Sequence, residues 1–316
     1  MKNIFLSAGI ILLLMLEGCK KEIDFTGHEG ERHVVVMSQL DPDSNICINL
    51  AFTQFFLDNG PVQTIDNADL HLWINGTEYT PDAVSNGNYC FNMKPHAGDS
   101  IWFEAAIPGW NNVSAGTRVV SSPQMSNVRF SRSREFAFVH MMDMYDIRFQ
   151  LDDPVDEREY YRIQLYEHIQ CPAYDTVEAV DTIQTSMFAY LGLNEAGDTT
   201  SPGINNAAMA SEVLLSDAYF NTPSKDVLLL TMPIVDTTGL LQRDYFVRVS
   251  TYSNETAKYL STVWSASSMM AIFAEPVQVY SNIKGGIGIF GSSSKKMIKA
   301  TYIPIDDEDD ESTHNR

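Results

Sequence analysis

The feature that most constrains the fold is a series of short segments, rich in β-branched and aromatic residues, which turn signals separate along the first third of the chain. Asn75-Gly76 stands between two of these segments and favours a two-residue hairpin. Several strands at this spacing, with no helical pattern between them, predict an antiparallel β-sandwich of the immunoglobulin-like kind. The predicted strands are 33–40, 46–54, 68–74, 88–93 and 100–107.

A second series of alternating segments begins after an extended stretch near Pro123 and predicts a second sandwich. Residues 171–224 interrupt this series, because they are rich in Thr, Ser, Asn, Ala and Gly and have weak periodicity. They predict a long insertion. The predicted strands of this series are 126–131, 144–151, 159–168, 226–232 and 244–252, followed by 283–290 and 299–305.

One short helix is predicted over residues 255–271, with Ser253 or Asn254 as its N-cap. The apolar positions at helical spacing are Tyr259, Leu260, Val263 and Trp264. The fold class is therefore mainly β, with two antiparallel β-sandwich (immunoglobulin-like) domains, a long insertion and one short C-terminal helix.

The first residues have the layout of a bacterial export signal. Lys2 gives a basic start, residues 4–16 are apolar, and a small residue precedes Cys19. The apolar run is shorter than the about 20 residues that a membrane-spanning helix needs. We expect cleavage before Cys19 and acylation of its thiol, although Glu17 departs from the usual small or apolar residues there. The alternative is an ordinary secretory peptide in which this cysteine is incidental.

These features divide the chain into five predicted parts. Residues 1–18 are the signal peptide, 19–31 the lipid anchor and tether, and 32–122 the N-terminal sandwich. Residues 123–305 form the second domain, including the excursion 171–224, and 306–316 form an acidic disordered tail.

The net charge of −20 limits the partners that the chain can have. A surface this acidic repels phosphate backbones, which excludes nucleic-acid binding. It also disfavours adsorption on anionic lipid, which agrees with a covalent anchor. The 44% hydrophobic content is ample for packed cores.

The cysteines predict at most one disulfide once Cys19 carries lipid. Cys47 and Cys90 are the favoured pair, because both lie in the first predicted domain, and Cys171 is left over. No CxxC occurs, and the histidines do not fall at the spacing of zinc ligands. No cofactor is expected.

Candidate ligand-binding residues are the aromatic side chains next to turn signals, Trp110, Phe55 and Phe56, whereas Trp73 and Trp102 are expected in the core. Candidate Ca²⁺ ligands surround Pro154, with a solvated turn as the alternative. These ligands are Asp152, Asp153, Asp156 and Glu157.

Two local patterns suggest chemistry that their context does not support. The glycines of 285–288 alternate with apolar residues, so they indicate a close backbone approach in a strand and not a phosphate loop. Ser292 and Lys295 fit the S-x-x-K serine-acylase signature, but its SDN and KTG partner motifs are missing. The sequence therefore predicts a protein that is not an enzyme.

Four stretches resemble the Bacteroidota lipoprotein family known as domain of unknown function 4249. They are 19–24 (CKKEID), 153–163 with Asp153-Pro154 and Tyr160-Tyr161-Arg162-Ile163, 215–217 (LSD) and 275–291 (EPV…SNIKGGIGIFG). The resemblance spans nearly the whole mature chain and implies an outer-membrane lipoprotein, encoded beside a TonB-dependent transporter and suspected of assisting uptake. It implies no catalytic residue.

Short Asp-Thr tripeptides also resemble the O-glycosylation sequon of exported Bacteroidota proteins. The three that fall in the predicted excursion are centred on Thr176, Thr182 and Thr199. We therefore expect any glycan to lie there.

These observations predict a non-enzymatic, lipid-anchored accessory or binding partner of a TonB-dependent transporter, located at the outer membrane and acting in nutrient uptake. The alternative is a structural or adhesive surface protein that binds extracellular polymers through the same loops.

Overall fold

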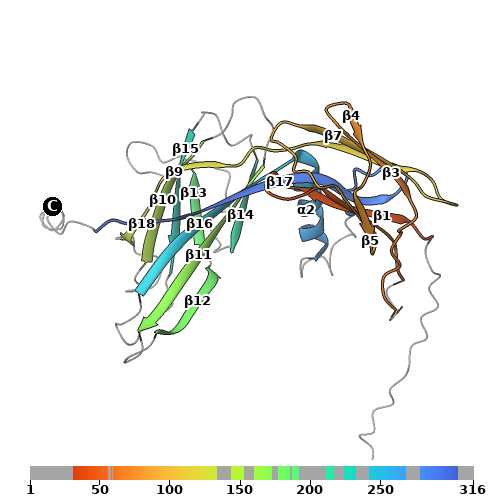
Figure 1. Ribbon diagram of the computed structural model, residues 1–316. Coiled ribbons are helices and arrows are strands. Elements are labelled where there is room, and N and C mark those ends of the chain that lie inside the picture. Colours follow the sequence, from red (N-terminus) through yellow and green to blue (C-terminus); the bar gives the residue numbers. More distant parts are fainter. Residues whose placement is uncertain are drawn as a thin grey trace, which may run out of the picture.

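The computed structural model describes residues 31–55, 58, 60–133, 144–152, 160–172, 177–185, 187–191, 211–216, 224–232, 242–267 and 278–304. The predicted signal peptide, the anchor at Cys19 and the acidic tail 306–316 lie outside these ranges. The described chain is mainly β and forms three sheets, of nine, five and four strands (Figure 1).

The first half of the molecule contains eight short strands. They are β1 (Val34–Leu40), β2 (Cys47–Phe52), β3 (Asp69–Ile74), β4 (Thr77–Tyr79), β5 (Ala83–Ser85), β6 (Asn88–Cys90), β7 (Ser100–Ala106) and β8 (Val113–Arg118). Strands β4-β3-β7-β8 make the four-stranded sheet, while β1, β2, β6 and β5 belong to the nine-stranded one. Both Asn-Gly turns have positive φ at each residue: Asn75 (49°) and Gly76 (85°), Asn86 (50°) and Gly87 (75°). The predicted hairpin at Asn75-Gly76 is confirmed by the pairing of β3 with β4.

The second half contains longer strands. They are β9 (Gln124–Ser133), β10 (Met144–Asp152), β11 (Tyr160–Pro172), β12 (Val177–Thr185), β13 (Met187–Leu191), β14 (Glu212–Ser216), β15 (Ser224–Thr231), β16 (Gln242–Tyr252) and β18 (Thr301–Tyr302). Strands β13-β15-β10-β9-β18 form the five-stranded sheet. Strands β12, β13 and β14 lie within the predicted excursion 171–224, so part of that segment is incorporated in the sheets.

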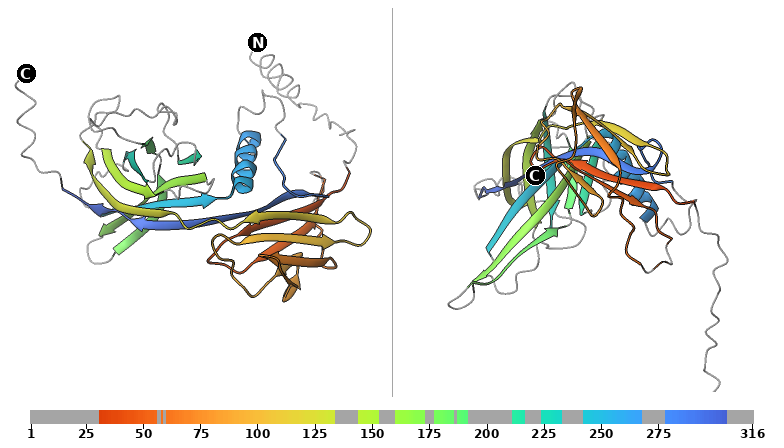
Figure 2. Two further views of the ribbon diagram at one scale, coloured as in Figure 1. Left: turned by 90° about the horizontal axis from the view of Figure 1, so that it is seen from above. Right: turned by 45° about the vertical axis from the view of Figure 1, so that its right-hand side comes forward.

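Strand β17 (Ile287–Lys299) joins the two halves. Its first part, 287–292, pairs in parallel with β1, and its second part, 293–299, pairs antiparallel with β16. The nine-stranded sheet therefore consists of two staggered groups of strands that meet at β17, which crosses the molecule in Figures 1 and 2.

The two hydrophobic cores lie on the same face of β17. Phe290 belongs to the first core and contacts Phe103 with ring centroids 4.9 Å apart. Ile298 packs against the second core, which β9, β10, β11, β15 and β16 build. Because these two residues are eight positions apart, strand alternation places them on one face. The range predicted for the second domain includes Ile283 and Phe290, whereas both side chains pack in the first core.

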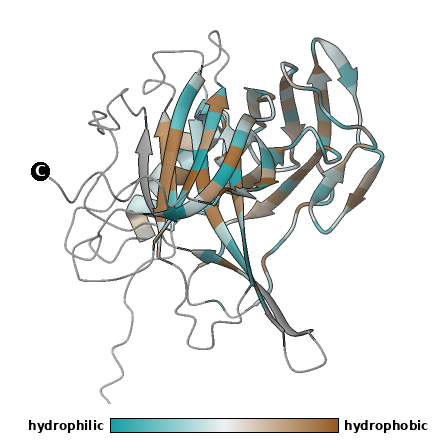
Figure 3. Cartoon of the chain, turned by 90° about the vertical axis from the view of Figure 1, so that its left-hand side faces the viewer, coloured by the Kyte–Doolittle hydropathy of each residue, from teal (hydrophilic) through white to brown (hydrophobic). Residues whose placement is uncertain are grey.

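Alternation of apolar and polar residues explains how the strands bury one face. In β1 every second residue is buried, and in Figure 3 brown and teal residues alternate along the strands. The glycines of 285–288 confirm the predicted close backbone approach. A Cβ at Gly285 would lie 2.1 Å from the Asn112 carbonyl oxygen, and one at Gly288 would lie 2.0 Å from that of Val36.

Helix α2 (Asn254–Ser267) follows β16 directly and rises from the sheet beside β17 (Figure 2). Ser253 is its N-cap, because its hydroxyl accepts the Thr256 amide at 3.4 Å. The helix can approach the sheet because Gly291 lacks a side chain: a Cβ there would lie 2.1 Å from the Thr256 hydroxyl.

Candidate functional site

The predicted aromatic residues lie at one end of the first half. Trp110 is 39% exposed and packs against Phe52 of β2 in a tilted arrangement, with ring centroids 4.6 Å apart. Phe55 follows β2, and Phe56 lies outside the described residues. Trp110 is thus partly covered by Phe52, and it lines none of the three pockets described below.

Cys47 and Cys90, the pair that the sequence favours, form a disulfide between β2 and β6. The two residues are directly opposite each other in the antiparallel ladder, with Cα atoms 4.1 Å apart. The bond crosslinks two neighbouring strands of the first half.

The remaining predicted sites are described only in part. Asp152 ends β10, but Asp153, Asp156 and Glu157 lie outside the described residues, and the described residues contain no group of three or more metal-ligating side chains. Thr182 is exposed on β12, where its hydroxyl lies 2.8 Å from His168 Nδ1. Thr176 and Thr199 are outside the described ranges.

The prediction that Trp73 and Trp102 fill the core was wrong. They are opposite each other on β3 and β7, on the outer face of the four-stranded sheet, and Trp102 is 38% exposed. His71 stacks on Trp73 at 6.0 Å, and Lys284 lies over the Trp102 ring at 5.5 Å. Alternation correctly separates two faces of a strand, but it does not identify the core face when both faces carry large apolar residues.

Among the described residues, the most polar of three pockets lies where the two halves meet. This junction groove has a volume of about 320 Å³. Strand β1 and the turn after it supply one wall, and β11, β16 and β17 supply the rest. The lining residues are Gln39, Asp41, Ser44, Arg162, Gln164, Arg248, Ser250, Tyr252, Ser293 and Lys295.

Strand register brings these side chains together. Arg248 lies opposite Gln164, and Ser250 lies opposite both Arg162 and Lys295. Because alternate residues share a face, the even positions of β11 and β16 and the odd positions of β17 line the groove, while their neighbours form the second core. The sequence contained this signal, since the alternation used to predict strand 244–252 also places its polar residues on one face.

Arg162 is the best-anchored cation of the groove. Its Nε donates to Glu212 Oε2 at 2.9 Å, and its Nη1 donates to the Tyr252 hydroxyl at 3.3 Å. Burial lowers the pKa of the guanidinium, but the hydrogen bonds to Tyr252 and Glu212 outweigh it, so the pKa of Arg162 is raised above its usual value. Arg162 therefore stays charged and orders Glu212 and Tyr252 around it.

An apolar groove adjoins the junction groove and shares Gln39 with it. Its volume is about 260 Å³, and it lies between α2 and strands β1, β2 and β17. Met37, Tyr259, Leu260 and Ile289 provide the apolar part of its surface. The two grooves together offer a polar and an apolar compartment next to each other.

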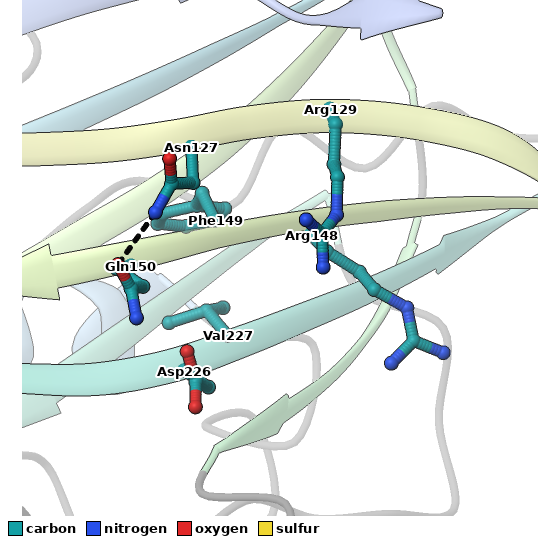
Figure 4. A pocket seen from close by; sticks show the side chains of 7 residues that line it. All are labelled: Asn127, Arg129, Arg148, Phe149, Gln150, Asp226 and Val227. Atoms are coloured by element: carbon teal, nitrogen blue, oxygen red, sulfur yellow. Dashed lines mark hydrogen bonds between the residues drawn. The ribbon is translucent and has the colours of Figure 1, made fainter. Parts of the chain in front are cut away.

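A third pocket, of about 220 Å³, lies on the five-stranded sheet (Figure 4). Arg129 and Arg148 are opposite each other on β9 and β10, and Asn127 donates to Gln150 at 2.7 Å. Asp226 from β15 lines the same pocket, and Arg148 pairs with Asp146 at 3.1 Å. Asp146 thus offsets the charge of Arg148, and Asp226 adds a second carboxylate to the lining.

The three pockets differ from many catalytic centres in the side chains that line them. None of the three is lined by a histidine, and the one lining cysteine, Cys47, is in the disulfide. What they do present is hydrogen-bond donors on rigid strands.

A comparison with protein families adds one finding. The model of the family described as "Domain of unknown function (DUF4249)" matches residues 20–299. This range includes every groove described above and every strand up to the end of β17. The chain belongs to the DUF4249 family. A search of curated proteins found no match to this DUF4249 chain. Among its described residues, no helix has both the length and the apolar character needed to cross a membrane.

Proposed function

We propose that this DUF4249 protein is a lipid-anchored, non-enzymatic binding protein of the outer membrane, which assists a TonB-dependent transporter in nutrient uptake. One observation carries the binding role: the junction groove, which both halves line with ten predominantly polar residues held on strands. A rigid scaffold that presents donors in a groove is typical of a binding site.

The location and the partner rest on the sequence. Cys19 stands where cleavage of the export signal would expose it for acylation, and a multiply acylated cysteine anchors a protein firmly. The resemblance of the four sequence stretches implies the transporter partner. We further propose that each half is an immunoglobulin-like sandwich domain, with the anchor leading into the first.

The pair of tryptophans on the outer sheet face favours a second candidate function. Trp73 and Trp102 lie on an outer sheet face together with His71 and Lys284. Aromatic surfaces of this kind contribute large contact areas at interfaces. A surface structural or adhesive protein that binds extracellular polymers would use this face, and would need no transporter.

A pull-down from the native membrane tests the proposed function. The C-terminally tagged protein is extracted in mild detergent, and its companions are identified by mass spectrometry. The Cys19→Ser variant, which cannot be acylated, is the control for association through the membrane. We expect a TonB-dependent transporter in stoichiometric amount with the wild-type chain. Recovery of the anchored protein alone would refute the accessory role and favour the polymer-binding function.

A polymer-binding assay separates the second candidate. A Trp73→Ala/Trp102→Ala variant should bind extracellular polymer as well as the wild type does if the transporter role is correct. Loss of adhesion in this variant, in a strain that lacks the transporter, would support the adhesive role instead.

A further inference from the structure

The charge of the junction groove is opposite to that of the whole chain. The protein has a net charge of −20, yet three cationic side chains, Arg162, Arg248 and Lys295, line this groove. Glu212 neutralises Arg162, and Asp41 is the one carboxylate among the lining residues. The lining therefore keeps an excess of positive charge.

Arg248 is oriented without being neutralised. Its Nη1 donates to the Tyr166 hydroxyl at 2.9 Å, and its guanidinium lies 4.6 Å from the centroid of the Tyr166 ring. Its Nη2 lies 3.9 Å from Met297 Sδ. Within the described ranges, no carboxylate forms an ion pair with Arg248 or with Lys295. Two charges of the same sign are thus held at one groove with donors unused.

We infer that the junction groove binds the oxyanion group of a small, hydroxyl-rich ligand, with Arg248 and Lys295 as its two charged contacts. The inference deepens the proposed function, since it names the ligand class of the same groove. A guanidinium offers paired donors that match a carboxylate or phosphate, and an ammonium adds a point charge.

The uncharged lining residues fit the remainder of such a ligand. Gln39 Nε2 donates to the Ser293 hydroxyl at 2.7 Å, so the amide and the hydroxyl are ordered before any ligand arrives. Ser44, Ser250 and Tyr252 add further hydroxyl groups. Asp41 can accept a hydrogen bond from a ligand hydroxyl, and it repels a second anionic group at its end of the groove.

The pocket between Arg129 and Arg148 is a weaker candidate for the same chemistry. Asp146 pairs with Arg148 at 3.1 Å, and Asp226 lines the pocket as well, so the one ion-paired arginine and the lining carboxylate reduce its excess of positive charge. The junction groove has three cations and one lining carboxylate, and its two unneutralised cations come from different strands.

Titration calorimetry on the full chain, purified in neutral detergent, tests the inference. The probes are citrate and tetragalacturonate as carboxylates, inorganic phosphate as the phosphate, and maltotetraose as an uncharged match for the sugar acid. We expect heat of binding with at least one anionic probe, none with maltotetraose, and weaker binding at higher ionic strength. Comparison of the affinities for the carboxylates and for phosphate shows which oxyanion the groove binds.

Four variants locate the binding. Lys295→Ala and Arg248→Ala should each weaken binding by about tenfold, equivalent to about 1.4 kcal/mol. Lys299→Ala is the matched control, because Lys299 lies on the same face of β17 but pairs with Asp244 at 2.7 Å. The Lys299→Ala protein should bind the probe with an affinity within about twofold of that of the wild type. Arg248→Lys, which keeps a charge, should lose less affinity than Arg248→Ala.

The outcomes separate this inference from the proposed function. Absence of binding to every anionic probe, or an equal loss in the Lys295→Ala and Lys299→Ala proteins, overturns the inference. Unfolding midpoints equal to that of the wild type confirm that each variant is folded. Calorimetry needs no transporter, so a failed pull-down with intact anion binding refutes only the transporter partnership.

Discussion

The two halves of the molecule are stabilised in different ways. The first half has strands of three to seven residues, no buried charged side chain among its described residues, and a disulfide between β2 and β6. The second half has strands of up to thirteen residues and buries an ion pair, Glu167 with Arg243, beside Tyr245. Among the described residues Glu167 is the one charged side chain that is fully buried. Short strands thus rely on a crosslink, and long strands tolerate a buried charge.

Strand β17 belongs to both halves and therefore connects their two cores with the junction groove. The first part of the strand adds Phe290 to the first core, and the second part adds Ile298 to the second core. Lys295 lies between these positions and lines the junction groove. Because one continuous strand fixes the relative position of the walls, the groove is built before a ligand binds.

The largest effect is expected from truncating β17 in the first core. Phe290 is 0% exposed, so Phe290→Ala should lower the free energy of unfolding by about 4 kcal/mol. Ile298→Ala, at a partly buried position of the same strand, should cost about half as much. Urea unfolding followed by far-ultraviolet circular dichroism measures both, since both halves contain strands that contribute to this signal. Equal losses in the two variants would contradict the separation into two cores.

Removal of the disulfide should destabilise the first half selectively. Cys47 and Cys90 are separated by 43 residues, so the Cys47→Ser/Cys90→Ser protein should lose about 3 kcal/mol. Cys171→Ser, which leaves the disulfide intact, is the control. Amide hydrogen exchange should show the loss in β2 and β6 and leave β11 and β16 protected. Faster exchange throughout the second half would mean that the two halves unfold together.

Neutralising the buried ion pair should destabilise the second half. Glu167→Gln removes the negative charge that pairs with the Arg243 guanidinium, itself almost buried, and should cost about 2 kcal/mol. Asp244→Asn removes the partner of Lys299, an ion pair that is mostly exposed, and should cost less than about 0.5 kcal/mol. Thermal unfolding measures both. If Asp244→Asn lowered the stability as much as Glu167→Gln does, the buried ion pair would contribute no more than the exposed one, and the prediction would be wrong.

The smallest effect is a loss of stability at high pH. Burial, together with the charge of Glu167, raises the pKa of Tyr245 above its usual value of 10.0. Below pH 10 both the folded and the unfolded states carry a neutral phenol, so this contribution to stability is fully present. Above pH 10 the unfolded state ionises first, and stability falls by about 1.4 kcal/mol by pH 11. Between pH 10 and 11 the free energy of unfolding of the Tyr245→Phe protein should fall less steeply than that of the wild type. An equal fall in the two proteins would contradict the assignment of this effect to Tyr245.

Local chemistry made much of the first half predictable. The strand before Asn75-Gly76, predicted over 68–74, was found within one residue of its bounds, because period-two alternation and the turn residues indicate the same structure. The helix began where Ser253 caps it. In contrast, the pairing of β1 with β17 joins residues more than 240 positions apart, and no local pattern specifies which strands become neighbours.

The candidate groove could be predicted only in its parts. Alternation places Arg248, Ser250 and Tyr252 on one face of a strand, but their meeting with Gln39 and Asp41 depends on the shared strand β17. For the same reason the sequence assigned Lys295 to a chance motif. Turn-adjacent aromatic residues such as Trp110 were easier to notice, yet Trp110 packs on Phe52 and lines none of the described pockets.

The most direct test of the account is a crystal structure of the full chain with the anionic probe that binds best in calorimetry. The account predicts ligand oxygen atoms within about 3 Å of both the Arg248 guanidinium and Lys295 Nζ, in the groove that β1, β16 and β17 form. A ligand held between Arg129 and Arg148, with the junction groove filled by water alone, would contradict it.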